Sequence, residues 1–94
     1  MAYLSGRVGQ VVGPFDSSDL LAKDGAISNF TPESSKPRLS KLGIQTAPDT
    51  IIEINGVTIR IGKTGIYELD NVVTVESLRF PNGADETTLV DFVY

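Results

Sequence analysis

The 94-residue chain contains no cysteine, no histidine and no tryptophan. Without cysteine there are no disulfide bonds and no thiolate chemistry, and without histidine as well the usual ligands of zinc, haem and iron–sulfur clusters are missing. Nucleophilic catalysis with histidine as the base is excluded for the same reason. The acidic residues lack the Asp-x-Asp-x-Asp spacing and closing glutamate of a calcium loop. We therefore expect a protein that is not an enzyme and that holds no cofactor and no metal.

Positive charge is scarce: 8 lysines and arginines stand against 12 aspartates and glutamates, for a formal net charge of −4. Most of the acidic excess lies in residues 48–94, and neither half has the basic stripe of a nucleic-acid-binding protein. No apolar run approaches the roughly 18 residues of a membrane span, and residues 1–15 show no export signal. We expect one small domain with a marginal core and with neither nucleic acid nor membrane as its partner.

Residues 50–61 carry the strongest structural signal, because Asn55–Gly56 lies in the middle of a run of alternating apolar residues. Asn-Gly is typical of a type I′ turn, which needs a positive φ at both central positions. A two-residue turn fixes the register of the hairpin, and every apolar residue of the run except Ile51 then falls on one face. The predicted opposing pairs are Ile54 and Val57, Glu53 and Thr58, Ile52 and Ile59, Ile51 and Arg60, and Thr50 and Ile61.

Further short strands are predicted in the second half, over residues 66–69, 72–80 and 87–94. Within residues 72–80 the apolar parity shifts, so we expect a bulge near Glu76 and Ser77. The chain is therefore expected to be mainly β, with residues 46–94 forming a small antiparallel sheet or half-sandwich. Its second layer must come from the N-terminal half or from another chain.

Residues 1–45 are predicted to form an extended arm, because glycine and proline interrupt every apolar run. Val8–Val12 is compatible with a short strand, and residues 17–23 are the one stretch compatible with a short helix, at most one or two turns long. Residues 29–38 have the composition of a linker. Such an arm is either a flexible tail or is ordered by a partner, and we favour the second interpretation. Four apolar residues are then expected to anchor it in a neighbouring subunit: Phe15, Leu20, Leu21 and Phe30. For the two phenylalanines, packing on their own sheet is an equal alternative.

Gly62–Lys63–Thr64 is similar to the end of a phosphate-binding P-loop, but its context is wrong. That motif needs four residues between its two glycines and a helix after the threonine. Here five residues separate Gly56 from Gly62 and alternate like a strand, and Ile66 continues as strand. The stretch therefore predicts a turn and no nucleotide site.

Three stretches resemble a small domain found in phage and prophage structural proteins of Gram-positive hosts. They are residues 42–50 (LGIQTAPDT), 54–56 (ING) and 61–69 (IGKTGIYEL), the last being the most specific. The closing residues 89–94 resemble the I-(I/V)-D-Y ending of that group. Related sequences often read Ala-Pro-Pro-Gly at residues 47–50, so we expect that turn to differ here. The resemblance covers about half of the chain and implies a structural virion component, with no catalytic residue to carry over.

The leading hypothesis is a non-enzymatic structural protein of a bacteriophage virion, assembled in the host cytoplasm. A multi-copy capsid decoration or cement subunit is favoured over a tail or baseplate component, because a small acidic module with an arm suits repeated docking on a shell. Its partners would be other virion proteins and further copies of itself, since symmetric packing supplies the buried area that a small core lacks. A second hypothesis is a host-surface carbohydrate-binding module, with Tyr67 or Tyr94 stacking on a sugar. A third is a small regulatory protein that binds a host protein as a stable monomer.

Overall fold

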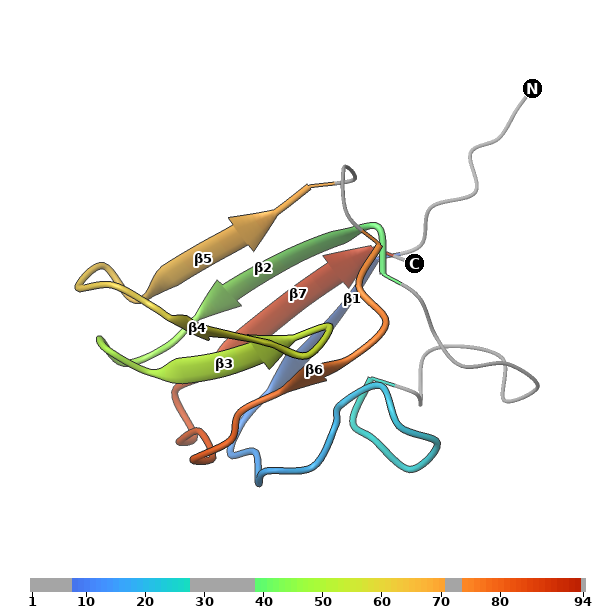
Figure 1. Ribbon diagram of the computed structural model, residues 1–94, viewed down its shortest axis with the longest axis horizontal. Helices are drawn as coiled ribbons and strands as arrows, with labels where there is room; N and C mark the ends of the chain where they lie inside the picture. The colour runs from blue at the N-terminus through green and yellow to red at the C-terminus, as the bar shows by residue number, and fades with distance from the viewer. Residues whose placement is uncertain (1–7, 28–38, 71–73, 94) are drawn as a thin grey trace.

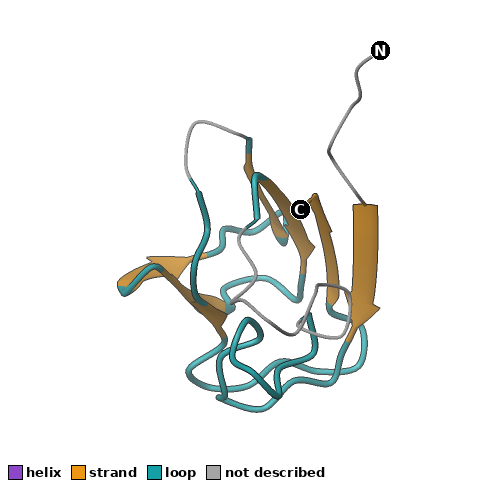
Figure 2. Ribbon diagram, turned by 90° about the vertical axis from the view of Figure 1, so that its right-hand side faces the viewer, coloured by secondary structure: helices purple, strands orange, loops and turns teal. Residues whose placement is uncertain are grey.

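The computed structural model describes residues 8–27, 39–70 and 74–93. Within these residues seven strands form two antiparallel sheets, and no helix occurs. The smaller sheet lies over one face of the larger (Figures 1 and 2), so the protein is mainly β, as predicted. In spatial order, the larger sheet holds β1 (Val8–Val12), β7 (Leu89–Val93), β2 (Lys41–Gln45) and β5 (Ile66–Leu69), and the smaller holds β4 (Val57–Arg60), β3 (Ile51–Ile54) and β6 (Leu78–Arg79).

The β3–β4 hairpin confirms the predicted register, from Ile54 opposite Val57 to Ile51 opposite Arg60. Asn55 and Gly56 have φ values of 50° and 83°, as the predicted turn requires. Asparagine and glycine adopt this left-handed conformation at the lowest cost, so the local sequence stabilises the turn without help from the rest of the chain.

Strands β1 and β2 correct the predicted division into an arm over residues 1–45 and a module over residues 46–94. β1 pairs with β7 along its whole length, and β2 lies between β7 and β5. Residues 8–12 and 41–45 therefore complete the larger sheet, and the second layer comes from the N-terminal half of the same chain. Two glycines stand inside these strands, Gly9 in β1 and Gly43 in β2. Gly9 lies opposite Phe92, whose ring occupies the space that a side chain would need.

The core lies between the two sheets and is closed by the segments that flank them. Its members are buried apolar side chains, each at most 4% exposed. The sheets contribute Leu42, Ile44, Val90, Phe92, Ile52, Ile54 and Leu78, and the flanking segments contribute Leu20, Leu21, Ile27, Leu39, Ile61, Val75 and Phe80.

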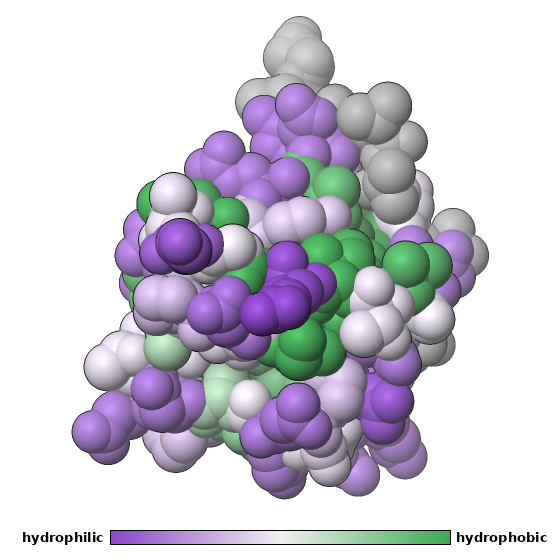
Figure 3. All heavy atoms as spheres, turned by 60° about the vertical axis from the view of Figure 1, so that its left-hand side comes forward, coloured by the Kyte–Doolittle hydropathy of each residue, from purple (hydrophilic) through white to green (hydrophobic). Residues whose placement is uncertain are grey.

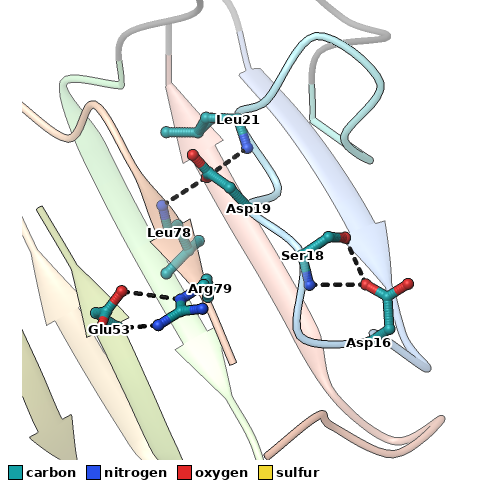
Figure 4. Close-up of polar contacts among 7 residues, drawn as sticks. All are labelled: Asp16, Ser18, Asp19, Leu21, Glu53, Leu78 and Arg79. Carbon is teal, nitrogen blue, oxygen red and sulfur yellow. Dashed lines mark hydrogen bonds and ion pairs between the residues drawn. The ribbon is translucent and has the colours of Figure 1, made fainter. Parts of the chain in front are cut away.

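Residues 17–23 do not form the short helix with which their sequence is compatible. The carboxylate of Asp19 accepts hydrogen bonds from the backbone N–H groups of Leu21, at 2.9 Å, and Leu78, at 3.0 Å (Figure 4). Aspartate side chains favour such non-helical turns because they bond the nearby backbone directly. This carboxylate joins the segment after β1 to β6, and it fixes Leu20 and Leu21 in the core.

Two further aspartates, Asp16 and Asp85, form turns of the same kind. Asp16 accepts from the backbone N–H and the hydroxyl of Ser18 (Figure 4), and Asp85 accepts from the same two groups of Thr87. In both cases the hydroxyl hydrogen bond is the main reason that the carboxyl pKa lies below its ordinary value. Each turn therefore stabilises a charged carboxylate at the surface.

Residues 72–80 do not form the single predicted strand. Residues 71–73 lie outside the described part of the chain, Val75 makes an isolated bridge, and β6 is only two residues long. The interruption falls at Glu76 and Ser77, where a bulge was expected. Their N–H groups donate to the side-chain oxygen of Asn55, at 2.8 and 3.2 Å, so the tip of the hairpin takes the place of a strand partner.

Candidate functional site

One face of the larger sheet is not covered by the smaller sheet, and we call it the outer face. Side chains alternate along a strand, so the register assigns every second residue of the four strands to this face. Exposure is high there, with Val8 at 78%, Val12 at 58% and Ile66 at 52%. Three rows cross the outer face: Val12, Leu89, Gln45 and Ile66; Gln10, Asp91, Gly43 and Glu68; and Val8, Val93 and Lys41.

An open hollow of about 660 Å³ lies on the larger sheet. Its lining includes three residues of the middle row, Asp91, Gly43 and Glu68, and the last row, Val8, Val93 and Lys41. Asp91 and Glu68 flank Gly43 in the middle row, which has a gap where a side chain would stand. A Cβ at Gly43 would meet nothing closer than Asp91 Cβ at 3.9 Å. Within the described residues no three acidic side chains gather into a metal-binding group, so the hollow offers charged walls without a ligand set.

The hydrogen-bond pattern of β1 shows which of its backbone groups are open. Gly13 N donates to Thr88 O at 2.8 Å, directly opposite in the β1–β7 register. Since alternate residues of an antiparallel strand point their N–H and C=O groups the same way, Gly9 and Val11 also face β7. Within the described part of the chain, β1 pairs on that side alone. The groups at the open edge belong to Val8, Gln10 and Val12.

The open edge of β1 differs from the other sheet edges in its charge. Each of the other three edge strands carries a charged side chain, Glu68 on β5, Arg60 on β4 and Arg79 on β6. β1 reads Val-Gly-Gln-Val-Val, with neither a charge nor a proline. Figure 2 shows this strand at the outside of the molecule, with no further strand beyond it. Charge and proline are the usual protection of an edge against pairing, so β1 is the least protected edge of the described structure.

Exposed apolar side chains also occur away from β1. Val57, at the tip of the hairpin, is 60% exposed, and Ile66 begins β5. On the face that Figure 3 shows, apolar side chains gather into a patch with hydrophilic residues around it. The surface is thus apolar in places, but among the described residues only β1 combines exposed valines with an open, uncharged edge.

Three of the four predicted anchor residues lie within the described part of the chain, and none of these three is exposed. Leu20 and Leu21 are 3% and 0% exposed in the core of their own chain, which corrects the expectation that they anchor a neighbouring subunit. Their burial depends on the contact with β6, which is distant in the sequence. Phe15 is half-buried and stacks on Phe80, with ring centroids 5.4 Å apart, so it packs on its own sheet. Phe30 lies outside the described residues.

Of the two predicted sugar-stacking tyrosines, Tyr67 lies within the described residues. Tyr67 lies on β5 opposite Ile44, where its half-buried ring packs against the core. Its neighbour Glu68 points to the outer face, so the tyrosine and the carboxylates of the hollow lie on opposite faces of the sheet. Tyr94 lies outside the described residues. Sugar binding through these residues stays a prediction.

The open edge is the feature that the sequence analysis missed. Val8–Val12 was recognised as a possible strand, and its lack of charge is visible in the sequence. Its position at the border of the sheet depends on pairing with β7, near the other end of the chain.

Within the described residues no helix is long and apolar enough to cross a membrane. No family model, no curated protein and no solved structure matches the chain.

Proposed function

We propose that the protein is a non-enzymatic structural subunit of a bacteriophage virion, which assembles in the host cytoplasm. The observation that carries the proposal is the open, uncharged edge of β1 beside the exposed side chains of Val8 and Val12. A free-standing monomer protects such an edge with charge, whereas a subunit of an assembly covers it with a neighbour. The resemblance of residues 42–50 and 61–69 to phage structural domains supports the same conclusion from the sequence.

Within the particle we favour a multi-copy capsid decoration or cement subunit over a tail or baseplate component. The chain is small, carries a formal net charge of −4, and has a two-layered core of modest size. Packing of many copies in a symmetric shell adds buried area to such a domain and stabilises it by mass action. Other virion proteins and further copies of the chain are the proposed partners.

The experiment is quantitative mass spectrometry of phage particles purified on a density gradient. A decoration subunit is expected at a copy number comparable to that of the major capsid protein, and a tail or baseplate component at a small fraction of it. A chain that is abundant in the infected-cell lysate but absent from purified particles would refute the structural role. Removal of the tails before the measurement separates the two locations within the particle.

A further inference from the structure

We propose that two copies of this chain pair edge to edge through β1, antiparallel, with Gln10 opposite Gln10 of the second copy. The pairing rests on the proposed function in one respect, since it names the partner that covers the open edge. In this register Val8 of each copy lies opposite Val12 of the other. The two larger sheets then join into one continuous sheet across a two-fold axis at Gln10.

The register follows from the backbone groups at the edge. Val8, Gln10 and Val12 are the residues whose N–H and C=O groups point away from β7. A symmetric antiparallel pair centred on Gln10 uses the groups of all three residues in both copies. A centre at any other residue of Val8–Val12 leaves one or more of the three without a counterpart within the strand. Main-chain pairing therefore favours the Gln10 register over its neighbours.

The side chains fit the same register. Val8 and Val12 are 78% and 58% exposed in the single chain. On the joined outer face, Val8 of each copy would pack beside Val12 of the other copy. Cross-strand pairs of β-branched residues are among the favourable pairs of antiparallel sheets. The edge is thus complementary to itself in both hydrogen bonding and apolar surface.

Charge does not oppose the pairing, although the chain is acidic. β1 carries no charged residue, and the nearest carboxylate in its central row belongs to Asp91 on β7. Gln10 Nε2 donates to Asp91 Oδ1 at 2.6 Å, so the amide lies between this carboxylate and the second copy. The two Asp91 side chains are then separated by two glutamines across the axis.

A second copy is the occupant that the edge fits best, because the pairing closes on itself. A two-fold pair consumes both open edges and leaves no further β1 to pair, so it ends at a dimer. A strand from a different protein would need only a free edge and would not require the complementarity of Val8 with Val12. A chain that stays monomeric by itself in the tests below would leave that alternative and would overturn the proposal.

The first test measures the mass of the full chain in solution over a concentration series, by light scattering or sedimentation. The unaltered chain is expected to approach twice its 10.1 kDa as concentration rises. Val12→Lys places a charge on the edge and is expected to raise the dissociation constant of the dimer by at least about tenfold. Val57→Lys is the matched control, because Val57 is 60% exposed but lies on β4 of the other sheet. Circular dichroism confirms that each variant is folded.

Two outcomes of this test would overturn the pairing. One is an unaltered chain that stays at 10.1 kDa up to about 1 mM, where association is negligible by the standard of specific interfaces. The other is a loss of the dimer in Val57→Lys equal to that in Val12→Lys. A monomeric chain that is still found in purified virions refutes the pairing alone, whereas a dimer that is absent from virions refutes the structural role alone.

The second test fixes the register with a single cysteine, which is unambiguous because the chain has none of its own. Opposite residues of a hydrogen-bonded pair have Cα atoms about 5.5 Å apart, within the range of a disulfide. Gln10→Cys is therefore expected to form a disulfide-linked dimer under mild oxidation, and Thr58→Cys, at an exposed position of β4, to remain monomeric. Equal cross-linking of the two variants, or none in Gln10→Cys, would overturn the proposed register.

Discussion

Replacement of Gly9 by alanine is expected to destabilise the fold. A Cβ at Gly9 would lie 2.5 Å from both Cε2 and Cζ of Phe92, and 3.3 Å from Cε1. Phe92 is 1% exposed, so its ring moves only if other core side chains move with it. Overpacking of this kind costs about 1–3 kcal/mol. Removal of a glycine from a strand offsets about 0.5–1 kcal/mol of that cost, through the lower entropy of the unfolded chain.

The expected net effect of Gly9→Ala is therefore a loss of up to about 2.5 kcal/mol in the free energy of unfolding. Urea denaturation followed by circular dichroism measures it, and each kcal/mol lowers the Tm by about 4–8 °C in a domain of this size. Gly43→Ala is the matched control within the same sheet, since its Cβ would make an ordinary contact of 3.9 Å with Asp91. That variant is expected to be neutral or to gain up to about 1 kcal/mol.

The sign of the Gly9→Ala effect separates a docked strand from a free arm. If Gly9→Ala stabilises the protein as much as Gly43→Ala does, β1 is not packed on Phe92 and our account of the larger sheet is refuted. A double-mutant cycle with Phe92→Leu adds a second criterion. The smaller leucine leaves room for the new methyl group, so the cycle is expected to show a favourable coupling of about 0.5–3 kcal/mol.

Three further predictions concern polar contacts outside the larger sheet. Asn55→Gly keeps the positive φ of the hairpin turn but removes the hydrogen bonds to the segment before β6, so it is expected to cost about 1–2 kcal/mol in urea unfolding. Asn55→Ala is expected to cost about 1 kcal/mol more, because alanine adopts a positive φ less readily than glycine. Equal stability of the two variants would contradict the turn geometry. Asp19→Ala leaves the backbone N–H groups of Leu21 and Leu78 without their acceptor, so it is expected to cost about 2–4 kcal/mol in the free energy of unfolding. The Leu78 amide should also exchange its hydrogen faster, and an unchanged exchange rate would disprove this role of Asp19. Hydrogen bonds from Arg79, at 2.8 and 3.1 Å (Figure 4), lower the pKa of Glu53 below its ordinary value in the folded state. The stabilisation from this pair is therefore complete above the unfolded pKa and is lost as pH falls through the lowered folded pKa. Over that acidic range the stability of the unaltered chain should fall more steeply than that of Glu53→Gln, and parallel pH profiles would count against the pair.

The open edge of β1 could be predicted only in part from the sequence. The strand at Val8–Val12 could be predicted from its β-branched residues, and its lack of charge is a property of the sequence. Whether such a strand lies in the middle of a sheet or at its edge depends on which segments pair with it. Leu20 and Leu21 show the same limit, because their apolar character is equally consistent with a partner's surface and with their own core. The contact of Asp19 with Leu78 decides between the two.

By itself the sequence determined the β class of the protein and the complete register of the β3–β4 hairpin. Both depend on residues close together in the chain, namely the φ preferences of Asn55 and Gly56 and the alternation of the strands beside them. The tertiary structure alone decided that residues 8–12 and 41–45 complete the larger sheet. That arrangement depends on pairing with β7 and on the ring of Phe92 over Gly9, contacts between residues far apart in the chain that no local pattern encodes.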